Sequence, residues 1–122
     1  MNYLLVFVGA GLGGVLRHIV NLLTLRWFGP NFPAGTFLIN ITGSIAMGMV
    51  IGYLTTRNVP GPEVRLFIAT GVLGGYTTFS TFSLDTIALW QRGEVGTAAA
   101  YVLGSLILSF TGLWLGMVLF RR

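Results

Sequence analysis

The feature that most constrains this chain is a set of long stretches without a charged side chain. Such stretches cover residues 27–56, 66–84 and 95–120, and the last of them is 26 residues long. A helix that crosses the hydrocarbon core of a bilayer needs about 20 mostly apolar residues, so each stretch can form most of a membrane span. The apolar residues run on continuously instead of alternating with polar ones, which argues against strands and against a membrane barrel. The sequence therefore predicts an all-α integral membrane protein.

The composition excludes several other classes of protein. Charged residues make up 8% of the 122 residues, whereas soluble domains carry about 25%, so the charges are too few to cover a surface in water. The absence of Cys and Lys and the single His leave no disulfide, no thiolate metal site, no lysine-containing phosphate loop and no Ser-His-Asp triad. We therefore expect no enzyme. The net charge of +4 reflects scattered Arg residues, which form no patch for nucleic acid and are interpreted as topology signals.

Four membrane spans are expected in a single domain over residues 1–122. The predicted helices cover residues 3–25, 33–56, 62–90 and 95–120, with short connections between them. An even number of spans puts both termini on one side of the membrane. Pairs of Gly four residues apart recur in the predicted helices and favour close helix contacts and an oligomer. These pairs are Gly9/Gly13, Gly48/Gly52, Gly71/Gly75 and Gly112/Gly116.

The positions of the Arg residues give a weak orientation signal. Four of them accompany the termini and the second connection, and two belong to the opposite side, so the usual excess of positive charge on the cytoplasmic side is small. Either orientation can then insert, which permits a homodimer of oppositely inserted copies; a single, weakly specified orientation is the alternative. The two groups are Arg57, Arg65, Arg121 and Arg122 on one side, and Arg26 and Arg92 on the other.

Residues 74–83, with the sequence GGYTTFSTFS, are the strongest local anomaly because they fall in the middle of the third predicted span. Adjacent Gly residues followed by β-branched Thr weaken a helix, and a broken helix in a membrane needs new partners for its backbone groups. Such breaks occur where a helix lines a cavity or where freed carbonyls bind a cation. A simple kink satisfied by Thr and Ser side chains is the alternative, but the five hydroxyl residues in the string favour a functional break.

Polar residues with a spacing of four form one stripe on the second predicted helix and another on the fourth. Hydroxyl and amide groups can donate hydrogen bonds to an anion without a fixed charge. Hydrogen bonding between helices is the alternative, and it explains one or two residues better than it explains aligned stripes. The stripes consist of Thr36, Asn40 and Ser44, and of Thr97, Tyr101, Ser105 and Ser109.

A few titratable residues lie within or near the predicted spans. Arg17 either extends to a lipid headgroup or makes a positive vestibule that attracts anions. His18 is interpreted as a packing residue rather than a proton carrier. Asp85 is expected near the membrane surface, solvated or paired with Arg92, rather than in a proton relay.

Three motifs together resemble the CrcB/Fluc family of fluoride channels. They are GGVLR at residues 13–17, NITG at residues 40–43 and the string at residues 74–83, in which Tyr76 occupies a variable position. The resemblance covers nearly the whole chain in length, number of helices and order of motifs. It implies an antiparallel dual-topology homodimer with two fluoride pores in the bacterial inner membrane. The implied role is passive fluoride efflux that reduces cytoplasmic fluoride toxicity, with fluoride, lipid and a second copy of the chain as partners.

The resemblance also assigns roles to individual residues. It implies a structural Na⁺ bound at the break by the backbone carbonyls of Gly74 and Thr77 from both subunits, a ligand set that suits a hard cation. The pore phenylalanines correspond to Phe79 and Phe82, whose ring edges carry partial positive charge and can contact fluoride; membrane packing is the alternative role. The polar track corresponds to Thr36, Asn40, Ser80, Thr81, Tyr101 and Ser105, together with Ser109.

Two other classes of membrane protein have a similar size. A dual-topology drug exporter would need a carboxylate inside the first helix, and residues 3–25 contain none. A purely structural membrane subunit would explain the composition but neither the stripes nor the break. Neutral donors that replace the hydration shell of a small anion without trapping it explain both features, so a fluoride channel is the predicted function.

Overall fold

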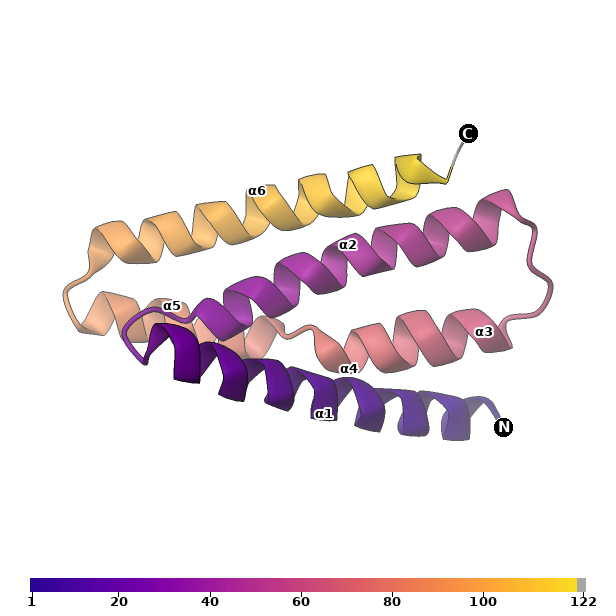
Figure 1. Cartoon of the computed structure of the whole chain (residues 1–122), viewed down its shortest axis with the longest axis horizontal. Coiled ribbons are helices and arrows are strands. Elements are labelled where there is room, and N and C mark those ends of the chain that lie inside the picture. The colour runs from indigo at the N-terminus through magenta and orange to yellow at the C-terminus, as the bar shows by residue number, and fades with distance from the viewer. Residues whose placement is uncertain (121–122) are drawn as a thin grey trace.

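The computed structural model describes residues 1–120. Arg121 and Arg122, which contribute to the expected orientation signal, lie outside the described residues. The described part folds into helices and short connections without a strand, which confirms the prediction of an all-α chain (Figure 1). In chain order the elements are α1 (Asn2–Phe28), α2 (Ala34–Thr56), α3 (Glu63–Arg65), η1 (Leu66–Leu73), α4 (Gly74–Tyr76), α5 (Phe79–Gln91) and α6 (Val95–Leu119).

Within residues 1–120, three helices are long and apolar enough to cross a membrane: α1, α2 and α6. Large apolar side chains cover their outer surfaces; for example, Phe7 on α1 is 78% exposed and Phe110 on α6 is 72% exposed. Apolar surfaces of this extent suit lipid or another apolar protein surface rather than water. The predicted third span is divided among the shorter elements α3, η1, α4 and α5.

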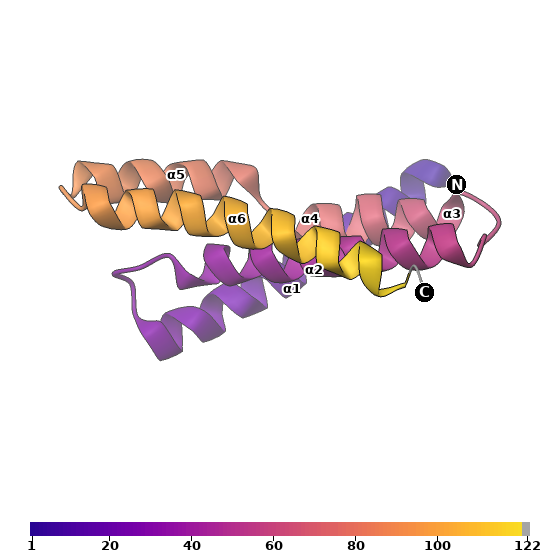
Figure 2. The ribbon, with the colours of Figure 1, turned by 90° about the horizontal axis from the view of Figure 1, so that it is seen from above.

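The helices pack in two main pairings. The helix α2 lies along α6, and α1 lies along η1 and α4 (Figures 1 and 2). The N-terminus and the C-terminal end of α6 lie at one end of the molecule, together with the connection at residues 57–62 (Figure 1). The connections at residues 29–33 and 92–94 lie at the opposite end. Because α2 and α6 are neighbours, the two polar stripes that they carry are brought together.

Glycine allows the closest approach between α1 and the interrupted segment. A Cβ atom added to Gly9 would lie 2.9 Å from Cα of Gly71, and one added to Gly75 would lie 2.8 Å from Cα of Ala10. Cβ atoms do not approach other atoms so closely, so these backbones can touch only because no side chain separates them. The Gly pairs of α1 and of the interrupted segment therefore serve contacts inside one subunit.

The segment before the interruption is wound more loosely than an α-helix. Over Leu66–Leu73 the backbone forms a π-helix, in which each hydrogen bond spans one residue more than in an α-helix. Such turns are rare and are frequently found at functional sites. No pattern in the sequence predicts this π-helix.

The interruption itself lies at Thr77 and Thr78, whose backbones are extended. The sequence predicts a break somewhere in residues 74–83, where adjacent glycines are followed by β-branched Thr. In the structure Gly74 and Gly75 are helical, and the break falls on the two Thr residues. Gly75 is instead required for the contact with α1. After the interruption Thr78 caps α5, because its Oγ1 accepts a hydrogen bond from the N–H of Thr81 at 3.2 Å.

Candidate functional site

Asn40, a half-buried residue on α2, holds the interruption in place. Its Nδ2 group donates to the carbonyl oxygen of Thr78 at 2.9 Å, and its Oδ1 accepts from the backbone N–H of Thr78 at 2.8 Å. Thr78 is 7% exposed, so its backbone groups need protein partners. An amide carries two N–H groups, and this pair uses only one of them. Asn40 therefore stabilises the extended backbone at Thr78 and is also a candidate donor to an ion.

An inner cavity of about 300 Å³ lies beside the interruption. Four of the predicted pore residues line it together: Asn40 from α2, Phe79 and Phe82 from α5, and Ser105 from α6. Ser109, one turn further along α6, also lines it. The two polar stripes and the interrupted string thus meet at one place. The remaining lining residues are Gly43, Ser44, Met47, Thr77, Thr78, Leu106 and Leu113.

Ser105 contributes a hydroxyl without a partner to this cavity. Among residues 1–120 its Oγ is the buried side-chain polar atom that forms no hydrogen bond. A Ser hydroxyl in a helix commonly donates to the carbonyl four residues earlier, as Ser83 does to Phe79 at 3.0 Å, but Ser105 does not. An unpaired buried hydroxyl costs about 1–3 kcal/mol. The O–H of Ser105, a residue that lines the cavity, thus has no acceptor among residues 1–120.

The two predicted pore phenylalanines have different surroundings. Their ring centroids lie 5.8 Å apart, but Phe79 is 77% exposed whereas Phe82 is half-buried against Tyr101, at 5.2 Å. Phe79 thus has a surface that is free of contacts inside this chain. Behind Phe82 lies an aromatic cluster, which consists of Phe32, Phe37, Phe82 and Tyr101.

Tyr101 is fully buried and lines neither this cavity nor the outer one described next. Its hydroxyl donates to Oδ2 of Asp85 at 3.0 Å. The expected pairing of Asp85 with Arg92 does not occur, because Arg92 forms an ion pair with Glu94 at 2.6 Å. Tyr101 therefore acts here through its ring and through its bond to Asp85, rather than as a wall of the inner cavity.

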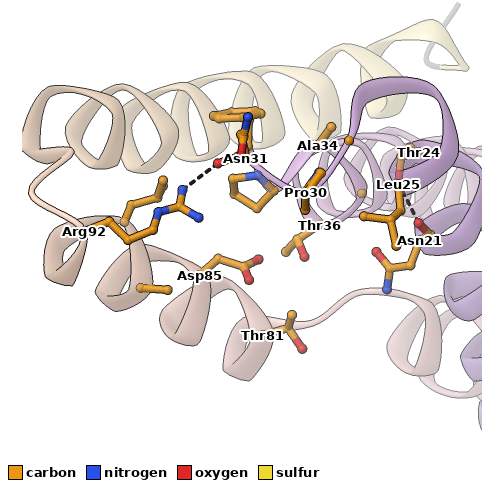
Figure 3. A pocket seen from close by; sticks show the side chains of 16 residues that line it. Asn21, Thr24, Leu25, Pro30, Asn31, Ala34, Thr36, Thr81, Asp85 and Arg92 are labelled. Atoms are coloured by element: carbon orange, nitrogen blue, oxygen red, sulfur yellow. Dashed lines mark hydrogen bonds between the residues drawn. The ribbon is translucent and has the colours of Figure 1, made fainter.

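An outer cavity of about 400 Å³ opens at the end of the molecule that carries the connections 29–33 and 92–94 (Figure 3). Two predicted track residues, Thr36 and Thr81, line it, as does Asp85. Figure 3 shows these side chains around one space, with Arg92 reaching across to Asn31 at its edge. The predicted track is therefore divided between an inner and an outer cavity.

The remaining predicted residues lie outside both cavities or at the interruption. Ser80 is exposed and lines neither cavity; its hydroxyl lies 3.4 Å from Oγ1 of Thr78. Arg17 is half-buried on α1 and also lines neither cavity. Gly74 is exposed, and Thr77 is half-buried with its hydroxyl donating to the carbonyl of Leu73 at 3.0 Å.

The carbonyls of Gly74 and Thr77 have lost their usual helical donors. In a continuous α-helix they would accept from the N–H groups of Thr78 and Thr81. Those N–H groups donate elsewhere, that of Thr78 to Asn40 and that of Thr81 to Oγ1 of Thr78. Residues 1–120 contain no cluster of three or more His, Cys, Asp or Glu residues that could hold a metal. The two carbonyls are thus chemically suited to a hard cation.

Sequence reasoning missed several lining residues. Asn21 and Thr24, one turn apart near the end of α1, line the outer cavity. Their spacing of three on one helix face is a signal that could have identified them. Thr78 was noted only as part of the string, because its partner Asn40 binds its backbone, which carries no sequence signal.

Comparisons with known proteins identify relatives along the whole chain. The family model for "CrcB-like protein, Camphor Resistance (CrcB)" matches residues 4–117. The protein "Fluoride-specific ion channel FluC 2" from Nitrobacter hamburgensis is 58% identical over 122 residues, which cover 100% of this chain and 98% of that protein. "Fluoride-specific ion channel FluC" from Rhodopseudomonas palustris strain BisB5 is 52% identical, with 99% and 98% covered. The protein of the same name from Mesorhizobium japonicum is 53% identical, with 93% and 94% covered. Because the family model and these relatives agree over almost its full length, the chain belongs to the CrcB family.

Proposed function

We propose that this chain forms a fluoride-selective channel that lets fluoride leave the bacterial cell passively and so lowers its toxicity in the cytoplasm. The chain is a multi-pass protein of the bacterial membrane, and its relatives carry the name of ion channels rather than of enzymes. The observation that carries the proposal is the buried, unpartnered hydroxyl of Ser105, a residue that lines the inner cavity together with Asn40 and Phe82.

Fluoride would exchange its hydration shell for neutral donors and ring edges along this path. The hydroxyls of Ser105 and Thr81 and the second N–H of Asn40 can each donate to an anion without holding it by a full charge. The edges of Phe79 and Phe82 carry partial positive charge. Conduction requires binding that is strong enough to admit the ion and weak enough to release it, which such a set of donors provides.

The interrupted segment, residues 63–91, would also cross the membrane, which gives four crossings in all. Its two helical pieces are joined by the extended residues Thr77 and Thr78, whose backbone is buried in protein or faces a cavity. Interrupted spans of this kind are tolerated in membranes only in such surroundings. In a variant whose orientation is fixed by Lys residues added to one connection, epitopes placed at residues 57–62 and 92–94 should be labelled from opposite sides of the membrane. Labelling of both epitopes from the same side would show that residues 63–91 do not cross the membrane.

The assembly would be an antiparallel homodimer of oppositely inserted copies, with two pores. Support comes from the exposed ring of Phe79, which has a free surface next to the inner cavity, and from the weak Arg signal. Tags at the C-terminus should then be accessible from both sides of the membrane in comparable amounts. A fully active sample with every C-terminus on one side would contradict the proposal.

A structural Na⁺ would lie where the interruptions of the two copies meet, held by the carbonyls of Gly74 and Thr77. The diverted N–H groups of Thr78 and Thr81 support this ligand set. When bound, the ion would supply positive charge that ties the two interrupted segments together. Since the ligands are carbonyls, Thr77→Ser should keep the ion, whereas Gly74→Val should weaken the dimer. A high-resolution density map with only water between the paired interruptions would count against it.

The function is tested by fluoride efflux from liposomes that contain the purified protein, read with a fluoride electrode. We expect efflux of fluoride that greatly exceeds efflux of chloride. Protein-free liposomes are the control. A drug exporter would instead transport organic cations, and a structural subunit would give no efflux of either ion.

A further inference from the structure

The connection between α1 and α2 sends one aromatic side chain into the interior of the chain. Phe32 is half-buried, and its ring packs edge-on against Tyr101 with a centroid distance of 5.7 Å and an interplanar angle of 87°. It also packs against Phe37 at 5.8 Å and 67°. Edge-to-face packing is a favoured and directional arrangement of aromatic rings. A residue of an end connection is thus part of the aromatic cluster behind the pore.

Tyr101 links this residue to the inner cavity. Its ring is fully buried and also contacts Phe82, at 5.2 Å, and Phe82 in turn lines the inner cavity. The hydroxyl of Tyr101 is bonded to Asp85, which fixes the outer tip of the ring. Close-packed side chains transmit displacements, and Tyr101, which is fully buried and lines neither cavity, is the close-packed ring between Phe32 and Phe82. A shift of Phe32 therefore reaches Phe82 through one intermediate ring.

Arg92 fixes the connection from the opposite side of the outer cavity. Its Nη2 group donates to the carbonyl of Asn31, the residue before Phe32, at 2.5 Å (Figure 3). Its Nε donates to Glu94 at 2.8 Å, so the guanidinium is held on two sides. The turn that carries Arg92 is itself closed, because the N–H of Glu94 donates to the carbonyl of Leu89 at 3.0 Å. The end of α5 thus anchors the backbone next to Phe32.

We propose that Phe32 is a positioning residue for the pore. Held by Arg92 through Asn31, it supports the ring of Tyr101 and thereby keeps the ring of Phe82 in its place in the inner cavity. Phe32 lines the outer cavity but not the inner one, so it acts on the ion path there through other rings. This inference rests on the proposed channel function, because the placement of Phe82 matters for transport only if fluoride passes it.

The test compares Phe32→Leu with Phe32→Tyr in liposomes at low protein density. Under these conditions the fraction of liposomes that empty counts active channels, and the rate of emptying reports on each channel. Phe32→Leu keeps an apolar side chain but removes the ring, so the fluoride rate per channel should fall about two- to tenfold, as for the loss of one edge-on aromatic contact. The ratio of fluoride to chloride efflux should fall as well. Phe32→Tyr keeps the ring and should restore both values.

Phe28→Leu is the matched control, because Phe28 is 63% exposed on α1 and belongs to no ring pair in the described chain. It should leave the rate and the ratio unchanged. Arg92→Gln should act in the same direction as Phe32→Leu but less strongly. The double variant should be less impaired than the two single effects combined, because both changes act on one line of contacts.

A purely structural role of Phe32 would reduce the fraction of active liposomes and leave the rate per channel and the ion ratio unchanged. That result would overturn the inference, as would a normal rate and ratio for Phe32→Leu. If the unaltered protein itself released no fluoride, the channel function and this inference would fall together. If the unaltered protein and Phe32→Leu both release fluoride normally, the channel function stands and only the inferred role of Phe32 is contradicted.

Discussion

Asn40 and Thr78 are joined by two hydrogen bonds across 38 positions of sequence, from the side-chain amide of one residue to both backbone groups of the other. The pair replaces, for one extended residue, the bonds that a continuous helix would supply. It also ties α2 to the start of α5 at the wall of the inner cavity. Any change at Asn40 therefore acts on the fold as well as on the wall of this cavity.

Replacement of Asn40 should separate these two roles. Asn40→Ala leaves two buried backbone groups of Thr78 without partners, at a cost of about 1–3 kcal/mol for each unpaired group, so the unfolding midpoint in detergent should fall. Asn40→Asp keeps an acceptor for the N–H of Thr78 but puts a negative charge beside the cavity, so fluoride efflux should be suppressed. Asn2→Ala, at the exposed start of α1, is the control for both measurements. Full efflux by Asn40→Asp would show that no anion passes this wall.

Replacement of the predicted pore phenylalanines, Phe79 and Phe82, should reduce efflux without loss of assembly. Phe79→Ile and Phe82→Ile keep apolar bulk but remove the ring edges, so the fluoride rate should fall sharply while the size of the complex in detergent stays the same. Phe110→Ile is the matched control, because Phe110 is similarly exposed and lines neither cavity. Normal efflux from well-folded Phe79→Ile and Phe82→Ile proteins would contradict the proposal that ring edges coordinate fluoride.

Ser105→Ala should have opposite effects on stability and on transport. It removes a buried hydroxyl without a partner, so the free energy of unfolding should rise by about 1 kcal/mol or stay the same. It also removes a donor from the inner cavity, so fluoride efflux should fall. Ser83→Ala removes a hydroxyl that is exposed and already bonded to the carbonyl of Phe79, and efflux should not change. Equal loss of stability and efflux in Ser105→Ala would indicate a packing role only.

Gly13 and Gly14, neighbours on α1, should respond oppositely to the same substitution. A Cβ at Gly13 would lie 2.8 Å from the backbone nitrogen of Tyr76, whereas one at Gly14 would meet no atom of this chain within 4 Å. Gly13→Ala should therefore lower the unfolding midpoint by an amount equivalent to about 1–3 kcal/mol. Gly14→Ala should raise stability by up to about 1 kcal/mol through helix propensity. A loss of stability in Gly14→Ala would mean that this face of α1 packs against another protein surface.

Much of the fold follows from the sequence because apolar runs and short connections leave few alternatives in a membrane. The long helices α1, α2 and α6 and the position of the interrupted string could be predicted in this way. Within that string the interruption falls on Thr77 and Thr78, whereas Gly75 is helical and contacts Ala10 of α1. No local pattern indicates the π-helix before it, which packs against α1.

The structure brings several of the predicted site residues together, but the bonds between them could not be predicted. The spacing of four placed Asn40 and Ser105 on facing stripes, and the structure brings both to the inner cavity. The bond between Asn40 and the backbone of Thr78 could not be predicted, since a backbone group has no sequence signature. Of the two alternatives for Asp85, solvation or pairing with Arg92, the pairing is not found. Asp85 lines the outer cavity and bonds to Tyr101 on α6, whereas Arg92 pairs with Glu94.

The interruption gives the chain two opposed electrical poles without a charged side chain. The helical piece that ends at Tyr76 turns its carboxyl end toward the interruption, and α5 turns its amino end toward it, where Thr78 caps one N–H group. A helix carries roughly −0.5 of an elementary charge at its carboxyl end and +0.5 at its amino end. One pole therefore attracts cations and the other attracts anions, although the residues between them are Thr77 and Thr78, which are neutral. Since these poles belong to the backbone, side-chain substitutions leave them in place, and only a sequence that made the helix continuous would remove both at once.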